Sequence, residues 1–220
     1  KFIRSQLDSI LCQLSFSDEI IISDDSSSDD TLELIKSYCD PRIKLFEGNV
    51  FHNPIFNFEN ALEKASGDFI FLCDQDDVWI EGKVAIMLRE LQCADLVISD
   101  AYIIDSDGEL LSDSFYALNN SSVGFLYNLM NNSYLGCTMA FKSAFKSLIL
   151  PFPRSIPMHD IWIGNVISLK GDVRFINDKL IKYRRHGGNV SPTGEKSSYS
   201  FWYRISYRFK LVIALARRLL

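Results

Sequence analysis

The apolar positions of the chain fall into two recurring patterns, helical stripes and short continuous runs. The first stripe has apolar side chains at Ile3, Leu7, Ile10 and Leu14, and residues three and four apart share one face of a helix. The run that follows, "EIIIS" at residues 19–23, is β-branched and too short for a helix. It therefore predicts a strand that is buried on both faces.

Strands and helices continue to alternate over most of the chain. Further helices are predicted at residues 30–38, 57–65, 83–91, 123–130 and 160–169, and further strands at "IKLFE", "DFIFLC", "DLVIS", "DVRFI" and "KLIKYRRH". The pair Asp107-Gly108 marks a hairpin-like turn, and the proline-rich segment "LPFPRSIP" is typical of a loop. This alternation predicts βα units that build a mainly parallel sheet with helices on both sides.

Two groups of acids follow predicted strands. Asp24 and Asp25 follow "EIIIS", and Asp74, Asp76 and Asp77 follow "DFIFLC". Ligands bind beyond the carboxyl ends of strands in parallel α/β sheets. A turn or a helix cap would equally explain the first pair, but capping needs one acid and not three. The second group repels itself unless a cation, a strong donor or a proton offsets the charge, and Mg²⁺ or Mn²⁺ takes such oxygen ligands.

Two classes of enzyme use such an arrangement. The strand and acids of "FLCDQDDV" resemble the start of a haloacid dehalogenase-like phosphatase, with Asp74 as nucleophile and Asp76 as acid. That class also needs a well-spaced final acidic motif, and "GDVRFIND" puts too many residues between its aspartates. In the other class, the acids hold a metal on the diphosphate of a sugar nucleotide.

Five segments favour the second class. In order they are "DEIIISDDSSSDDTLELIKSY", "NFENALEKASGDFIFLCDQDDVW", "GCTMAFK", "HDIWIGNVISLKG" and "YRRHGGNVS". Together they resemble family 2 inverting glycosyltransferases, most closely the bacterial rhamnosyltransferase type, over roughly residues 1–192. The resemblance implies a GT-A fold, a Rossmann-like α/β/α sandwich. It also implies transfer of a sugar, with rhamnose as a candidate, from a nucleotide diphosphate to a hydroxyl in bacterial cell-surface polysaccharide synthesis.

The same resemblance assigns the donor side of the site. Asp24 and Asp25 match the acids that contact the nucleotide base and ribose. Asn57 stands where many relatives have an arginine, and is a further candidate for a nucleotide contact. Asp74 and Asp76 match the DXD motif, which contacts the donor diphosphate and holds Mg²⁺ or Mn²⁺. Asp76 is the better candidate for a direct metal ligand.

The remaining assignments concern the metal and the acceptor. His186 matches a histidine that completes the metal shell, with a surface histidine as the alternative, and Asp77 is expected to support the loop. Asp160 matches the catalytic base, with a helix cap as the alternative. Beside it, His159 is expected to assist by hydrogen bonding and Trp162 to form an apolar wall for a sugar. The implied acceptor is a saccharide or a lipid-linked saccharide.

The start of the sequence leaves a third class open. The first helical stripe begins without a capping residue, and the first strand of the family should precede Lys1. We therefore expect residues upstream of Lys1 to be missing. If the protein lacked that strand, its base pocket would be incomplete, and the chain would be a catalytically inactive sugar-nucleotide-binding module.

Composition limits the partners and the compartment. With 220 residues, 47% of them hydrophobic, the chain can bury the core of one domain. Its net charge of −5 argues against nucleic acid as a partner. No apolar stretch approaches the roughly 18 to 20 residues that a membrane span needs. The five cysteines form no CxxC pair, and we expect them to be reduced core residues of a cytoplasmic protein.

The C-terminal segment has a different charge pattern. After a predicted flexible linker, residues 196–220 contain six basic residues and no acid, and "FWYRISYRFKLVIALARRLL" has the pattern of an amphipathic helix. Such a helix can lie on the anionic inner face of the cell membrane. A packed helix, or one that joins a partner subunit, is the alternative. We therefore separate residues 193–220 from the catalytic domain at residues 1–192.

Overall fold

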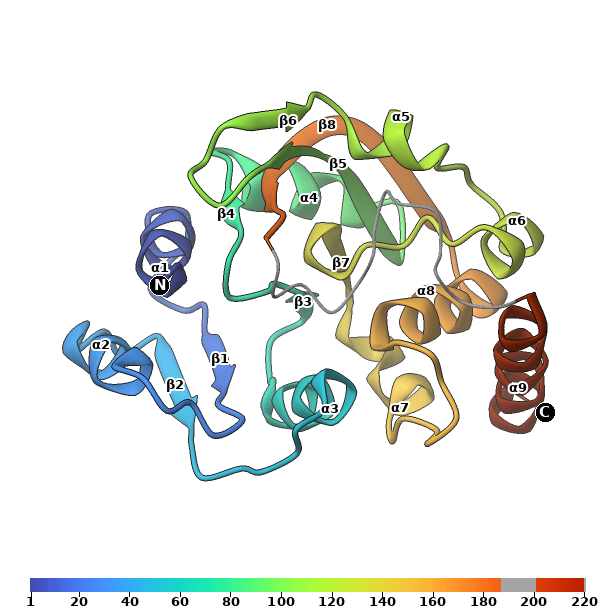
Figure 1. Ribbon diagram of the computed structural model, residues 1–220, viewed down its shortest axis with the longest axis horizontal. Helices are drawn as coiled ribbons and strands as arrows, with labels where there is room; N and C mark the ends of the chain where they lie inside the picture. Colours follow the sequence, from blue (N-terminus) through green and yellow to red (C-terminus); the bar gives the residue numbers. More distant parts are fainter. Residues whose placement is uncertain (187–200, 220) are drawn as a thin grey trace.

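A computed structural model describes residues 1–186 and 201–219. The elements appear in Figure 1, in chain order, as α1 (Ile3–Leu11), β1 (Ile20–Ser23), α2 (Thr31–Ser37), β2 (Ile43–Phe46), α3 (Pro54–Lys64), β3 (Phe69–Phe71), β4 (Val78–Trp79), α4 (Lys83–Leu91), β5 (Leu96–Ile104), β6 (Leu110–Ser112), α5 (Phe115–Asn119), α6 (Phe125–Met130), β7 (Met139–Lys142), α7 (Lys146–Ile149), α8 (His159–Lys170), β8 (Val173–Arg184) and α9 (Phe201–Leu219). Short 3₁₀ turns lie at Gly136–Thr138 and Ser143–Phe145.

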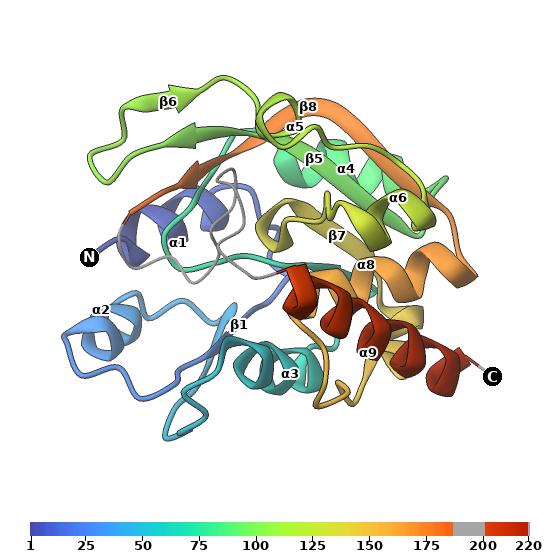
Figure 2. The same cartoon turned by 45° about the vertical axis from the view of Figure 1, so that its right-hand side comes forward.

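The larger sheet is mixed, and the prediction of a mainly parallel sheet is wrong. Its strand order is β3-β7-β5-β8-β4, with β6 paired to β5. Only β5 and β8 run parallel, and these long strands lie side by side in Figures 1 and 2. The other four pairings are antiparallel. The turn at Gly108, where φ is +95°, is one cause, because a tight hairpin forces β6 to run against β5.

Helices cover both faces of this sheet, as predicted. On β5, Leu96 and Ile98 point into a core built with α3, α7, α8 and α9, whereas Val97, between them, packs with Met87 and Leu91 of α4. Successive strand residues face opposite sides, so one strand serves two cores. The result is an α/β/α sandwich.

The final strand is longer than predicted. Two strands were expected, but β8 runs without a break alongside β5. The polar residues Asn177 and Asp178 suggested an interruption; both are exposed where the pairing register shifts, so the strand absorbs them as an irregularity. The helix α3 also begins earlier than expected, at Pro54, because the Asn53 side chain accepts a hydrogen bond from the Ile55 amide at 2.9 Å.

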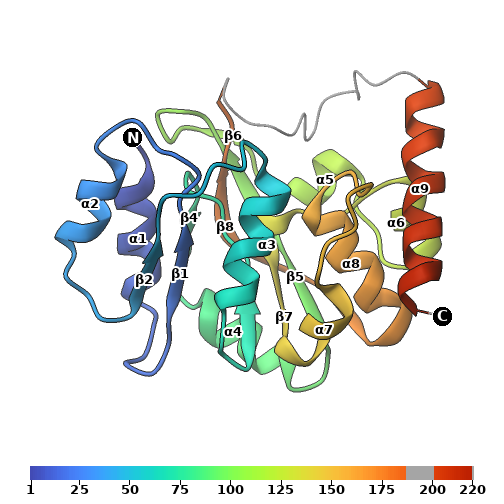
Figure 3. The same cartoon turned by 90° about the horizontal axis from the view of Figure 1, so that it is seen from below.

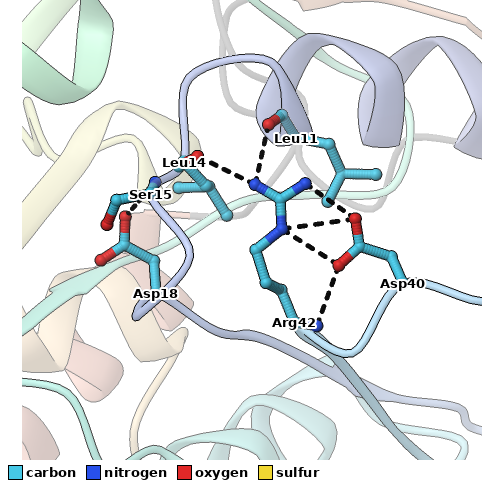
Figure 4. Close-up of polar contacts among 6 residues, drawn as sticks. All are labelled: Leu11, Leu14, Ser15, Asp18, Asp40 and Arg42. Atoms are coloured by element: carbon cyan, nitrogen blue, oxygen red, sulfur yellow. Dashed lines mark hydrogen bonds and ion pairs between the residues drawn. The ribbon is translucent and has the colours of Figure 1, made fainter.

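Arg42 fixes α1 against the start of β2 (Figure 4). Its Nη1 donates to the carbonyl oxygens of Leu11 at 3.1 Å and Leu14 at 2.8 Å, which lie at and just after the end of α1. Its Nη2 and Nε also bind the Asp40 carboxylate, at 2.7 and 3.0 Å. A cation at the carboxyl end of a helix satisfies carbonyl groups that have no partner within the helix.

The strands β1 and β2 form a separate parallel sheet. Among the described residues, β1 pairs only with β2, and β3 pairs only with β7. A groove of about 730 Å³ lies between β1 and β3, and α1 and α3 contribute to its walls. Its apolar lining includes Ile10, Ile20, Ala61, Phe69 and Phe71. The α/β layers are therefore interrupted at this point.

The predicted C-terminal helix forms as α9 and packs on the domain. Leu211, Ala214 and Leu215 are buried in the same core as α8. Arg218 Nη1 donates to the carbonyl oxygens of Leu148 and Leu150, at 3.1 and 2.8 Å. The predicted linker lies outside the described residues, and the domain boundary at residue 192 stays a prediction.

In residues 1–186 and 201–219, no helix combines the length and the apolar character that crossing a bilayer requires.

The cysteines differ from the prediction in their burial. All five are free, but only Cys137 is buried and Cys73 is half-buried. Cys12, Cys39 and Cys93 are exposed. Each of the exposed three lies at or just after the end of a helix, where an apolar neighbourhood in the sequence does not imply a place in the core.

Candidate active site

Three carboxylates lie in the short loop that joins β3 to β4. Asp76 and Asp77 are 5% and 0% exposed, and Asp74 is half-buried. The carbonyl oxygen of Asp74 accepts a hydrogen bond from the side-chain Nε2 of Gln6 in α1. The carbonyl oxygen of Asp76 accepts one from Arg184 Nε at 2.9 Å. Two elements far apart in the sequence therefore hold this acid loop, residues 74–77, in place.

The pKa values of Asp74 and Asp77 are raised. Burial and then the neighbouring acids, Asp77 first and Asp160 last, raise the pKa of Asp74 well above its usual range. Burial and then the charge of Asp76 raise the pKa of Asp77 to about 7. Asp77 Oδ1 accepts from the Arg184 amide at 2.8 Å, whereas its Oδ2 is buried and has no hydrogen-bond partner among the described residues. A cation near these oxygens would offset the repulsion.

A buried lysine accompanies the acid loop. Lys83, the first residue of α4, is fully buried, and its Nζ donates to the carbonyl oxygen of Cys137 at 2.7 Å. The same Nζ lies 4.7 Å from the centre of the Trp79 ring. Burial lowers its pKa to about 8, and nearby groups including Asp77 act in the opposite direction. Lys83 thus provides a positive charge inside the protein that partly offsets the acids.

His186 joins the acid loop from the end of β8. Its Nε2 lies 2.8 Å from Asp76 Oδ2, and its ring stacks on Phe2, with the ring centres 5.4 Å apart. The Arg184 guanidinium lies 4.5 Å from the centre of the same Phe2 ring. The structure therefore brings together two of the predicted metal ligands, Asp76 and His186. A surface histidine without a link to the site does not describe this arrangement.

The first turn of α8 carries Asp160. Its Oδ1 accepts from the Ile161 amide at 2.7 Å, and its Oδ2 accepts from the Gly136 amide at 3.2 Å. Met158 occupies the N-cap position, so Asp160 is not the helix cap. Burial raises the pKa of Asp160 to about 6. Gly136 is followed by Cys137, which has its ligand atom within 4.8 Å of those of Asp74 and Asp77, so Asp160 lies near the acid loop.

His159 is buried beside Asp160. Its ring stacks on Phe58 of α3, with centres 3.8 Å apart, and in the part of the chain that the structure describes neither ring nitrogen has a hydrogen-bond partner. Burial lowers its pKa to about 3, so the ring is neutral at neutral pH. Gly136 leaves room for the His159 ring, because a Cβ at Gly136 would lie only 3.1 Å from His159 Nε2. A hydrogen bond from His159 to an acceptor stays a prediction.

The prediction that Trp162 forms a wall for a sugar is wrong. Its side chain is fully buried, and its indole N–H donates to the carbonyl oxygen of Ile149 at 2.9 Å. The Arg218 guanidinium of α9 lies 5.6 Å from the centre of its ring. Each residue along a helix turns by about 100°, so Trp162 and Asp160 point in nearly opposite directions from α8.

The first acidic pair shapes turns at the end of β1. The Asp25 carboxylate accepts from the three backbone amides of residues 51–53, at 2.5, 3.0 and 3.2 Å. Burial raises the pKa of Asp25, but these hydrogen bonds outweigh it and the net shift is downward. Asp24 is buried, and its Oδ2 accepts from the Ser27 amide at 3.1 Å. Nucleotide contacts by Asp24 and Asp25 stay predictions.

Asn57 lies in the first turn of α3. Its Oδ1 is buried, and within residues 1–186 and 201–219 it has no hydrogen-bond partner. A buried polar atom of this kind usually has a partner, and a bound ligand or an ordered water can supply the missing donor. The predicted nucleotide contact of Asn57 is therefore chemically reasonable, and it stays a prediction.

The residues of the acid loop fit a hard divalent cation. Asp74, Asp77 and Cys137 each have one ligand atom within 4.8 Å of the others. The predicted set of Asp74, Asp76 and His186 shares only Asp74 with this cluster. Burial raises the pKa of the Cys137 thiol well above its usual range, and a protonated thiol is a poor metal ligand. Carboxylate oxygens remain as the donors, and these suit Mg²⁺ or Mn²⁺.

Some residues of the site were not found from the sequence. The burial of Lys83 could have been inferred, because Lys83, Met87 and Leu91 are spaced four residues apart and such residues share one face of a helix. In the structure all three are buried. That spacing places Lys83 on the apolar face of its helix. Gln6 and Arg184 had none, since their contacts with the acid loop depend on how distant elements pack.

Comparisons with known proteins extend this description. Residues 1–149 match the family model "Glycosyl transferase family 2". The chain is 28% identical to the UDP-Glc:alpha-D-GlcNAc-diphosphoundecaprenol beta-1,3-glucosyltransferase WfgD of Escherichia coli, over 91% of this chain and 78% of that protein. It is 34% identical to the GalNAc(5)-diNAcBac-PP-undecaprenol beta-1,3-glucosyltransferase of Campylobacter jejuni, over 42% of this chain and 31% of that protein.

A similar fold is found among solved structures. The crystal structure of S. aureus TarS 1-349 in complex with UDP-GlcNAc superposes with a TM-score of 0.71 at 16% sequence identity. The superposition covers 99% of this chain, which spans 65% of that structure. At this identity the likeness concerns the fold alone.

Proposed function

Because this chain belongs to glycosyl transferase family 2 and has the predicted GT-A α/β/α fold, we propose that it transfers a sugar from a uridine diphosphate donor to a lipid-linked saccharide. The observation that carries the proposal is that Asp160 lies near the acid loop: it accepts from the Gly136 amide, and the neighbouring Cys137 has its ligand atom within 4.8 Å of those of Asp74 and Asp77. The predicted nucleotide-sugar chemistry needs acids for a metal and a separate acid as base, and these residues are our candidates for the two roles.

The relatives guide the choice of substrates. WfgD is named for a UDP-Glc donor and a diphosphoundecaprenol-linked acceptor, and the Campylobacter protein for a PP-undecaprenol acceptor. We therefore favour UDP-glucose as the donor, and the rhamnose expectation gains no support from these names. A diphosphate lipid would carry the acceptor sugar, which suits cell-surface polysaccharide synthesis. The family match decides against the phosphatase alternative.

The acid loop serves the donor. Asp74 and Asp76, with His186 against Asp76, would hold Mg²⁺ or Mn²⁺, which supplies positive charge opposite the leaving diphosphate. The Gln6 side chain and Arg184 Nε donate to the backbone carbonyl oxygens of Asp74 and Asp76, and these contacts hold the loop in place.

Asp160 serves the acceptor. As general base it takes the proton of the acceptor hydroxyl while that oxygen attacks the anomeric carbon of the sugar. Attack opposite the leaving diphosphate inverts the anomeric centre. The amides of Gly136 and Ile161 orient the carboxylate, and its raised pKa of about 6 makes it a stronger base than an exposed aspartate.

The donor proposal is tested by thermal unfolding. We expect UDP and UDP-glucose to raise the melting temperature with Mn²⁺ or Mg²⁺ and not with EDTA, because the acids otherwise repel a diphosphate. A ligand at a hundred times its Kd stabilises by about 2.7 kcal/mol. Asp76→Ala should remove the metal-dependent part, and Asp178→Ala, at an exposed position of β8, is the matched control.

Three other outcomes would change the proposal. Equal stabilisation with and without metal would end the metal role, and no stabilisation by any nucleotide diphosphate would refute the donor class. Nucleotide binding without transfer to any lipid-linked acceptor would leave the inactive binding module as the function.

Transfer is expected to fall as the pH drops below about 6. Burial raises the pKa of Asp160 to about 6, and a general base must be deprotonated to act. Asp160 is half protonated at its pKa, so kcat/KM should fall by about tenfold per pH unit well below pH 6 and level off above about pH 7. Measuring kcat/KM from pH 5 to 8, with unfolding checked at each pH, tests this. A level profile down to pH 5 would contradict it.

A further inference from the structure

The outer face of α9 is apolar although it is exposed. Trp202 and Phe209 are 76% and 66% exposed, and Ile205 and Val212 are exposed as well. These four positions are three or four residues apart, so they form one stripe along the helix. The opposite face, with Leu211 and Leu215, is buried in the core. The helix is therefore folded onto the protein on one side and has an apolar stripe on the other.

The neighbouring helix α6 also exposes apolar side chains. Leu126 is 75% exposed, Met130 is exposed, and Val123, just before the helix, is exposed as well. Arg208 of α9 donates to the carbonyl oxygen of Leu129 at 3.1 Å and to that of Met130, so the two helices are joined. Figure 3 shows α6 next to α9 at one end of the molecule. The α6–α9 surface is thus defined by Val123, Leu126, Met130, Trp202, Ile205, Phe209 and Val212.

The charged residues of the two segments that form this surface are all basic. No acidic residue occurs in residues 201–219, and no charged residue at all occurs in residues 114–141. Lys210 and Arg217 are exposed on α9, and both lie on the same side of the apolar stripe. The protein as a whole has a net charge of −5, so this local absence of acids stands out. An apolar stripe with basic neighbours complements an anionic lipid surface.

We propose that the α6–α9 surface docks the protein on an anionic lipid bilayer. Aromatic side chains such as Trp202 and Phe209 suit the boundary between lipid headgroups and acyl chains. The inference rests on the proposed function, because a lipid-linked acceptor is itself confined to a membrane. It goes beyond that function by assigning a surface to the contact.

The position of α9 agrees with an acceptor-side contact. It packs on α8, the helix that carries Asp160, and Arg218 lies against Trp162 two residues further on. The sheet of β1 and β2, where Asp25 is predicted to meet the nucleotide, lies at the other end of the molecule (Figures 1 and 3). Docking through α9 would therefore leave the nucleotide end directed away from the lipid.

Vesicle binding tests the proposal on the full chain. We expect co-sedimentation with phosphatidylglycerol-containing vesicles, weaker binding to phosphatidylcholine alone, and a decrease with salt. The double variant Trp202→Ser/Phe209→Ser should bind at least about tenfold more weakly, because two large apolar side chains no longer leave water. Phe16→Ser, which removes an aromatic side chain that is 88% exposed elsewhere, should bind as the unaltered protein does.

Fluorescence gives a second measurement. Of the three tryptophans, Trp79 and Trp162 are buried, so an emission shift on adding vesicles reports on Trp202. No shift and no binding at any salt, or equal binding by the double variant, would overturn the proposal. A dimer in light scattering that the double variant abolishes would identify the surface as a contact between copies. Stabilisation of the double variant by UDP is measured in the same way, with and without metal. If that stabilisation is retained, a negative vesicle result refutes the docking surface and leaves the proposed function standing.

Discussion

Replacing Asp160 with asparagine is expected to lower turnover by roughly 10² to 10⁴ while donor affinity stays unchanged. The variant keeps the shape of the side chain and one accepting oxygen for the Gly136 or Ile161 amide, but it cannot take a proton. The loss corresponds to about 3 to 5 kcal/mol of transition-state stabilisation. Donor binding depends on the acid loop and should not change. Paired measurements of UDP-sugar affinity and of turnover with a lipid-linked acceptor test both parts.

The control for this variant is Asp178→Asn, which makes the same change at an exposed position of β8. Its turnover should equal that of the unaltered protein. If Asp160→Asn keeps more than about a tenth of the turnover, the effect is smaller than loss of a base produces. Asp160 would then be a structural residue that orients Gly136, and the base would have to be sought among the other acids.

Replacing Lys83 with methionine is expected to lower the free energy of unfolding by about 3 to 5 kcal/mol. Methionine nearly fills the volume, but the carbonyl of Cys137 loses its donor and the buried acids lose the cation near them. Denaturant unfolding measures the change. Lys170→Met, at an exposed position of α8, is the matched control and should stay within about 0.5 kcal/mol.

The pH dependence of this loss separates charge from packing. The pKa of Asp77 is raised to about 7, so the folded state carries a penalty that is absent at low pH and complete above pH 7. At pH 7.5, just below the pKa of Lys83, the lysine still offsets part of that penalty. Lys83→Met should therefore cost more at pH 7.5 than at pH 5. An equal cost at both would assign the effect to packing alone.

The sequence predicted those features that depend on local pattern. Asp74 and Asp76 follow a buried apolar strand, and such a strand end is recognisable from hydrophobicity alone. Asp160 lies in the first turn of a helix that begins within one residue of its predicted start. The resemblance to a family placed all three in one site. These are relations between neighbours in sequence, or between motifs in a fixed order.

What could not be predicted depends on packing between distant elements. The sheet is mixed because β7 returns between β3 and β5, which no strand pattern encodes. Trp162 is as close to Asp160 in sequence as a binding residue would be, but the helical rotation buries it. The support that Gln6 and Arg184 give to the acid loop uses its backbone carbonyls, so the identity of the loop residues says little about those partners.

The groove between β1 and β3 offers backbone hydrogen-bonding groups on both of its sides. Each of these strands has one unpaired edge among the described residues, and the space between them is lined by apolar side chains. A strand edge of this kind is a template for further pairing, and proteins usually cover or charge such edges. A strand that entered the groove could pair with both edges and join the two sheets into one.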